Sequence, residues 1–108
     1  MSALHREWVN DAADQGYSFN GFHIQPHMLA GLKRYAEHGI EPGGFLTAVI
    51  CNDLKDAVGR ADSESLRNLP AFVGWLYNEA PAACWGSEEI MQKWISDKEK
   101  ALQQEIKP

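Results

Sequence analysis

With 108 residues, the chain is long enough to bury a hydrophobic core as one domain without help from a metal or a disulfide. Its formal charge of −5 argues against binding to duplex nucleic acid, which normally requires a strongly basic face. The sequence contains neither a run of about 18 apolar residues, as a membrane span requires, nor an N-terminal signal-peptide pattern. We therefore expect one domain over residues 1–108, located in the cytoplasm. In that compartment Cys51 and Cys84 are expected to be reduced thiols.

Helical periodicity is present in five segments, and no convincing strand alternation accompanies it. The first predicted helix covers residues 2–15, with Ser2 as its N-cap and Gly16 as its left-handed stop. Residues 17–25 are rich in aromatic side chains, but their apolar spacing is too broken for a strand. We therefore expect an ordered loop at 17–25 that packs on the core.

The second predicted helix begins at Pro26, a residue suited to the first turn, and ends at Gly39. Ile40 is expected to make the hydrophobic contact that often closes a glycine C-cap. After Pro42 turns the chain, a third helix is predicted from Gly43 to Arg60. Its apolar stripe has residues spaced three and four apart, namely Leu46, Val49, Ile50, Leu54, Ala57, Val58 and Ala61.

A fourth helix is predicted to begin at Asp62 or Ser63 and to reach Glu79. Pro70 removes a backbone hydrogen bond and crowds the preceding turn, so we expect a kink or break near Asn68 and Leu69. The stretch after Pro70 is apolar almost all round, which indicates a central position or a subunit contact.

Ser87 is the predicted N-cap of a fifth helix. The inner face of this helix is expected to contain Ile90, Met91, Trp94, Ile95 and Leu102. Polar residues dominate from Lys98 onward, so the last turns are expected to fray or project. The predicted fold class is all-α, a compact bundle of about five helices in a single domain.

Two glycine-marked turns, Gly43-Gly44 and Gly86-Ser87, lead directly into predicted helices. The first N–H groups of a helix have no partner within it and lie at the positive end of its dipole, so they are either capped or available to an anion. Neither turn matches the dinucleotide-binding or the P-loop pattern. Two interpretations therefore stay open: a tight turn between helices, or a phosphate site to which Arg60 or Arg34 adds positive charge.

Three other constellations favour structure over chemistry. His23 and His27 are four residues apart, but Pro26 between them opposes a shared helix face, so we expect surface imidazoles and no metal. Cys84 precedes a helix start, where a thiol is activated, yet a buried cysteine is the commoner role. Asp53 lies near the apolar stripe and is expected to accept hydrogen bonds from another helix start or from a buried Trp or Tyr. We expect no cofactor and no catalytic residue.

Aromatic residues are abundant, with four Trp, three Tyr and four Phe, more than one small core needs. Trp75 and Tyr77 are two positions apart, so one helix face cannot bury both. Because aromatic side chains are enriched in contact surfaces, we expect Tyr77-Asn78-Glu79-Ala80-Pro81, together with Trp85, to line a groove or a self-association surface. A homo-oligomer is one of the resulting predictions.

Several motifs occur in an order and spacing that are distinctive together. They are Pro42-Gly43-Gly44-Phe45-Leu46-Thr47-Ala48-Val49, Asn52-Asp53-Leu54, Ala57 with Arg60-Ala61-Asp62, Tyr77-Asn78 with Pro81, and Cys84-Trp85-Gly86-Ser87. On these motifs, within residues 28–95, the chain resembles a family of small accessory proteins from tailed bacteriophages and prophages. The resemblance implies a protein of the bacterial host cytoplasm that interferes with host machinery or host defence, by sequestering a nucleotide signal or by binding a host protein.

The sequence therefore favours a non-enzymatic accessory protein that acts by binding, as a host-defence antagonist. In the sharpest form of this prediction, a homo-oligomer sequesters an anionic, nucleotide-like ligand: Gly43, Gly44 and Ser87 meet phosphate, Arg60 adds charge, and Tyr77 or Trp85 stacks on a base. The alternative is an inhibitor that binds a host protein through its acidic and aromatic surface. A hydrolase that depends on Cys84 or Asp53 is the least favoured hypothesis.

Overall fold

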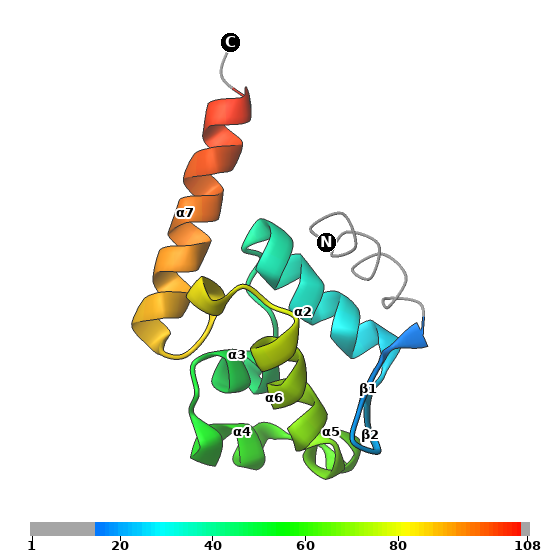
Figure 1. The fold of residues 1–108 in the computed structure, drawn as a ribbon. Helices are drawn as coiled ribbons and strands as arrows, with labels where there is room; N and C mark the ends of the chain where they lie inside the picture. Colours follow the sequence, from blue (N-terminus) through cyan, green and yellow to red (C-terminus); the bar gives the residue numbers. More distant parts are fainter. Residues whose placement is uncertain (1–14, 107–108) are drawn as a thin grey trace.

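The computed structural model describes residues 15–106, so the helix predicted at 2–15, apart from Gln15, lies outside the described residues. The described part is mostly helical, with one small sheet (Figure 1). The all-α prediction is therefore right for most of the chain and wrong for its first described segment. In chain order the elements are β1 (Tyr17–Phe19), β2 (Phe22–Ile24), α2 (Pro26–His38), α3 (Gly44–Ile50), α4 (Leu54–Arg60), α5 (Ser63–Arg67), α6 (Leu69–Asn78), the 3-10 helix η1 (Ala82–Cys84) and α7 (Glu88–Ile106).

The expected loop at 17–25 is instead an antiparallel hairpin. Phe19 pairs with Phe22, and Tyr17 pairs with Ile24. The two residues between the strands, Asn20 and Gly21, have φ angles of 49° and 85°. Positive φ at both turn positions matches the right-handed twist of the strands, and the Asn-Gly dipeptide is the sequence signal for this turn. The hairpin therefore depends on the turn chemistry more than on strand alternation.

Helix α2 begins at Pro26 and ends before Gly39, as predicted. Gly39 has a φ of 70°, and its N–H donates to the Tyr35 carbonyl at 2.8 Å. The expected closing contact of Ile40 is wrong, because this side chain is 51% exposed. Gly39 instead faces α7, where an added Cβ would lie 2.7 Å from Lys98 Cβ.

The predicted third helix is two helices, α3 and α4. Asn52 has a φ of 62°, a left-handed conformation that stops α3, and Asp53 starts α4 by accepting a hydrogen bond from the Asp56 N–H at 3.2 Å. Asp53 thus caps its own helix and does not make the tertiary contact expected of it. Because the helix breaks, Leu54 and Val58 are 68% and 43% exposed and do not continue the buried stripe.

The predicted break before Pro70 is confirmed, and it separates α5 from α6 at Asn68. The Asn68 side chain uses both ends of its amide there. Its Nδ2 donates to the Glu64 carbonyl at 2.9 Å, and its Oδ1 accepts from the His23 N–H at 2.8 Å. Asn68 therefore ties the hairpin to the α5–α6 junction.

The core lies between α2, α3 and α6, and its largest fully buried side chains include Trp75, Tyr35 and Phe72. Phe72 meets Phe45 edge to face, with ring centroids 5.0 Å apart. The Tyr35 hydroxyl donates to the Cys84 carbonyl at 2.7 Å. This bond links the middle of the core to η1, the turn that leads into α7.

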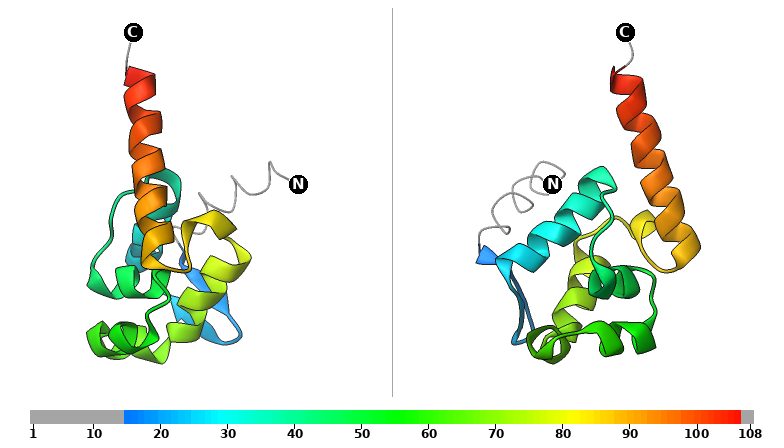
Figure 2. Two further views of the ribbon diagram at one scale, coloured as in Figure 1. Left: turned by 90° about the vertical axis from the view of Figure 1, so that its left-hand side faces the viewer. Right: turned by 180° about the vertical axis from the view of Figure 1, so that it is seen from behind.

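The predicted N-cap of α7 is confirmed, since Ser87 Oγ accepts from the Ile90 N–H at 3.1 Å. Trp94 Nε1 donates to the carbonyls of Tyr35 and Ala36, each at 3.2 Å, and so joins α7 to the end of α2. The last turns of α7 project away from the other helices, as expected (Figures 1 and 2). Leu102 is on this projecting part and is 57% exposed, so its expected place on the inner face is wrong. Within residues 15–106, no helix has the length and apolar character needed to cross a membrane.

Candidate functional site

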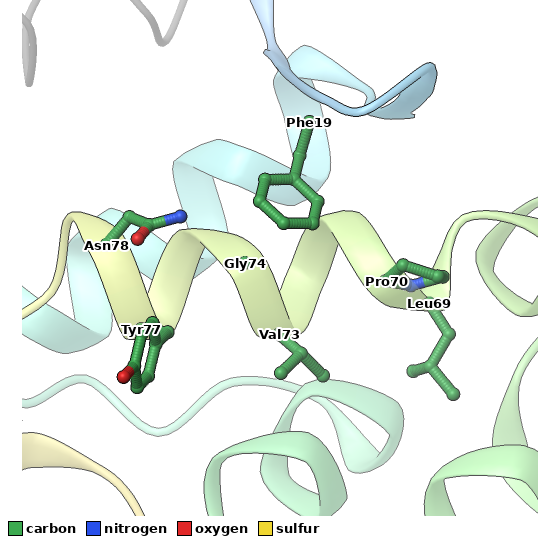
Figure 3. Close-up of a pocket in the computed structure, with 7 residues that line it drawn as sticks. All are labelled: Phe19, Leu69, Pro70, Val73, Gly74, Tyr77 and Asn78. Atoms are coloured by element: carbon green, nitrogen blue, oxygen red, sulfur yellow. The ribbon is translucent and has the colours of Figure 1, made fainter.

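A groove of about 580 Å³ runs along the outer face of α6 (Figure 3). Seven residues line it, and none of them is charged. Figure 3 shows Phe19 over one side of α6, with Val73 and Tyr77 on the other side and Gly74 between them. The full lining is Phe19, Leu69, Pro70, Val73, Gly74, Tyr77 and Asn78.

Gly74 allows the hairpin to form one wall of this groove. A Cβ added at Gly74 would lie 2.8 Å from Phe19 Cγ, closer than any real carbon contact, so only glycine permits the ring to rest on the helix backbone. Phe19 is the last residue of β1, directly before the Asn20-Gly21 turn. The groove therefore requires both the hairpin turn and the missing side chain on α6.

The second wall is a ridge on α6 formed by Leu69, Val73 and Tyr77. These residues are four positions apart and therefore lie on one face of the helix, one above the other. Val73 is 44% exposed and Tyr77 is 77% exposed, whereas Phe72 and Trp75 on the inner side of α6 are almost fully buried. The apolar character all round α6 thus serves the core on one side and an open ridge on the other.

The expected anion site at Gly43 and Gly44 is assembled only in part. A Cβ on Gly44 would lie 2.9 Å from Arg60 Nη1, so the guanidinium group lies against the start of α3, and the space beside Gly43 is open. The Arg60 Nε also donates to Asp56 Oδ2 at 2.8 Å, which compensates much of its charge. The structure therefore brings Arg60 to Gly44, as the prediction requires, but pairs it with a carboxylate.

The other expected site residues lie elsewhere. The Gly86 N–H donates to the Ile50 carbonyl at 2.8 Å, which places Trp85 and Ser87 beside the C-terminal end of α3. Since seven helical residues rise about 10 Å, the Gly44 and Gly86 turns are at opposite ends of α3. Tyr77 belongs to the α6 groove, and Trp85 does not line it. The six residues expected to bind a nucleotide-like ligand therefore do not form one pocket.

The thiols have the opposite character from catalytic nucleophiles. Cys84 is fully buried, and burial raises the pKa of its thiol to about 11. The pKa of Cys51 is also raised, first by burial and then by the negative charge of Glu88. A nucleophilic cysteine requires a lowered pKa, so neither thiol is activated.

His23 lies on β2 and His27 in the first turn of α2, and both line a small pocket that also includes Asp62 and Glu64. His23 Nδ1 lies 3.0 Å from Ser18 Oγ across the hairpin, and His27 is exposed in the first turn of α2. In the part of the chain that the structure describes, no three His, Cys, Asp or Glu side chains are grouped closely enough to hold a metal ion. The α6 groove is accordingly the candidate site that the geometry favours.

Comparison with known proteins does not assign a function to this groove. No protein-family profile matches the chain, and no curated protein or solved structure shows significant similarity to it. The resemblance to phage accessory proteins therefore stays a prediction. Sequence reasoning placed Tyr77 and Asn78 in a groove and read the apolar stretch after Pro70 as central or as a subunit contact. It missed the wall that Phe19 forms from the hairpin, because it expected a loop there.

Proposed function

We propose that this chain is a non-enzymatic binding protein and that the groove along α6 binds an apolar segment of another protein. The observation that carries the proposal is the ridge of Val73 and Tyr77, exposed beside an uncharged groove. Aliphatic and aromatic side chains left open to water next to a groove are typical of contact surfaces, because covering them removes apolar area from water.

The resemblance to phage accessory proteins suggests where such a partner is found. We propose that it is a protein of the bacterial host and that binding inhibits it, with the host cytoplasm as the setting. The net charge of −5 favours a partner with a basic surface around its apolar segment.

Two valine substitutions test this proposal. Val73 in the groove and Val58 on α4 are exposed to nearly the same extent, 44% and 43%. Affinity capture from a bacterial lysate, with mass spectrometry, should find a stoichiometric protein held by the wild type and by Val58→Asp but lost by Val73→Asp. A partner that Val73→Asp retains and Val58→Asp loses would place the binding surface on α4 and contradict the proposal.

A second candidate function rests on Arg60. Its guanidinium group lies against Gly44, beside the open space at Gly43. The alternative function is therefore the binding of an anionic, nucleotide-like ligand in that space. Isothermal titration with cyclic dinucleotides, cyclic oligonucleotides and ADP-ribose derivatives tests it. Binding should weaken in Arg60→Gln and persist in Arg67→Gln, another exposed arginine paired within its own helix. No heat with any of these ligands at micromolar protein rules this function out.

A further inference from the structure

We infer that Asn68 is the positioning residue of the α6 groove, because it holds the hairpin where Phe19 rests on Gly74. Asn68 does not itself line the groove. The affinity for a partner therefore depends on a residue that lies outside the contact surface. This inference rests on the proposed function and specifies what keeps the groove in shape before a partner binds.

The side chain of Asn68 holds the outer edge of the hairpin. Asn68 Oδ1 accepts from the His23 N–H at 2.8 Å, so this N–H points away from β1, as alternate N–H groups of an antiparallel pair do. The amide oxygen thus takes the place that the carbonyl of a third strand would have. His23 directly follows Phe22, and Phe22 pairs with Phe19. The bond therefore fixes β2 one residue away from the pair that carries the groove wall.

Asn68 also fixes the helix on which that wall rests. Its carbonyl accepts from the Ala71 N–H at 2.9 Å in the first turn of α6, and Gly74 follows less than two turns after Asn68. Its Nδ2 donates to the Glu64 carbonyl at 2.9 Å and to Glu64 Oε2 at 3.1 Å, which holds the amide in one orientation. Asn68 is only 8% exposed, so water competes little for these bonds. One residue thus sets the positions of the hairpin and of α6 relative to each other.

A carboxamide suits this position because it supplies a donor and an acceptor together. Aspartate has no donor for the Glu64 carbonyl and adds a second carboxylate beside Glu64 Oε2. Serine can cap a helix, but its side chain is one bond shorter and cannot join His23 to Glu64.

The turn of the hairpin does not provide this positioning. Asn20 and Gly21 are both exposed, and within residues 15–106 a Cβ at Gly21 would meet nothing within 4 Å. At the other end of the hairpin, Ile24 is fully buried and anchors the base of β2. A two-stranded hairpin is marginally stable by itself. The bond from His23 to Asn68, between the base and the turn, therefore decides how closely Phe19 approaches α6.

Proton NMR of the full chain tests the inference through Gly74. A Cβ there would lie 2.8, 2.9 and 3.0 Å from Phe19 Cγ, Cδ1 and Cδ2, so the Hα in that direction lies over the face of the ring. The ring current shifts such a proton upfield. We expect an upfield Gly74 Hα in the wild type that returns to an ordinary position in Phe19→Ala. Asn68→Ala should lose most of this shift. The control Asp62→Ala removes the N-cap of α5 but leaves the bond from His23 to Asn68, so it should keep the shift.

The outcomes separate the inference from the proposed function. If circular dichroism shows Asn68→Ala to be unfolded, Asn68→Ser takes its place, since serine can still cap α6. A Gly74 Hα that stays upfield in the Asn68 variant overturns the inference and leaves the proposed function intact.

Affinity provides the second readout. A partner that depends on Val73 should bind the Asn68 variant about tenfold more weakly, because the groove is no longer preorganised, and should bind Asp62→Ala as it binds the wild type. Equal binding to the Asn68 variant overturns the inference. If no protein captured from the lysate depends on Val73, the proposed function fails, while the shift of Gly74 still tests the role of Asn68.

Discussion

Replacing Gly74 by alanine tests whether the hairpin rests on the bare backbone of α6. The added methyl group would lie 2.8–3.0 Å from three carbons of the Phe19 ring, Cγ, Cδ1 and Cδ2. Rotation of the ring about χ2 leaves Cγ in place, so the contact is relieved only by a change of χ1 at Phe19 or by a shift of the strand. We therefore expect Phe19 to withdraw from the helix and one wall of the groove to open.

Two opposing terms set the size of the effect. Alanine is favoured over glycine within a helix by about 1 kcal/mol, whereas overpacking a fitted contact costs about 1–3 kcal/mol. The expected net change for Gly74→Ala is a loss of about 1 kcal/mol in the free energy of unfolding, or about 4–8 °C in Tm for a domain of this size.

Gly59 provides the matched control, because it is also within a helix and a Cβ there would meet nothing within 4 Å. Gly59→Ala should therefore stabilise the chain by about 0.5–1 kcal/mol. Urea titrations followed by circular dichroism measure both variants, together with Phe19→Ala and the Phe19→Ala/Gly74→Ala double variant. In the Phe19→Ala background the overpacking is gone, so Gly74→Ala should stabilise the chain by about 0.5–1 kcal/mol, as Gly59→Ala does. If Gly74→Ala stabilises the chain as much as Gly59→Ala does, Phe19 does not rest on Gly74.

Two further predictions concern the buried contact between α2 and η1. Tyr35→Phe removes the hydroxyl that donates to the Cys84 carbonyl, and leaving this buried carbonyl unpaired should lower the free energy of unfolding by about 1–3 kcal/mol in urea. Stability should also fall as pH rises above about 9, because the folded Cys84 thiol keeps its proton up to a pKa of about 11 while the unfolded chain releases it earlier. The loss approaches about 3 kcal/mol near pH 11. The raised pKa values of Tyr35 and Cys51 act in the same direction. Cys84→Ala should flatten the profile of urea midpoint against pH, and an unchanged profile in that variant would assign the effect to Tyr35 and Cys51.

Helix ends set by local chemistry could be predicted from the sequence. Pro26, Gly39, Pro70 and Ser87 each act on the backbone within one turn, and the structure places a helix start, stop or break at each. The neighbouring sequence is sufficient for such signals. The bounds of α2, the break between α5 and α6, and the start of α7 followed from them.

The split between α3 and α4 could not be predicted in the same way, because two local signals compete there. The apolar spacing continues through Leu54 and Val58 and favours one long helix, while Asn52 and Asp53 favour a stop and a new N-cap. Hydrophobic periodicity determines the helix only where the apolar stripe is buried, and Leu54 and Val58 are both exposed in α4. The left-handed Asn52 and the N-cap Asp53 therefore end one helix and start the next. In the same way, the turn at Asn20 forms the hairpin although the apolar spacing on either side of it is irregular.

The walls of the candidate site could not be predicted from the sequence, because they depend on which glycine faces which side chain. The prediction placed a ligand at Gly43 and Gly44, since a residue without a Cβ lets another group approach the backbone. The chain itself uses that property twice: Arg60 lies against Gly44, and the Phe19 ring lies against Gly74. Contacts between residues so far apart in sequence are fixed only by the folded structure. The groove therefore combines a glycine that Phe19 covers with an apolar ridge, where Val73 and Tyr77 remain exposed to solvent.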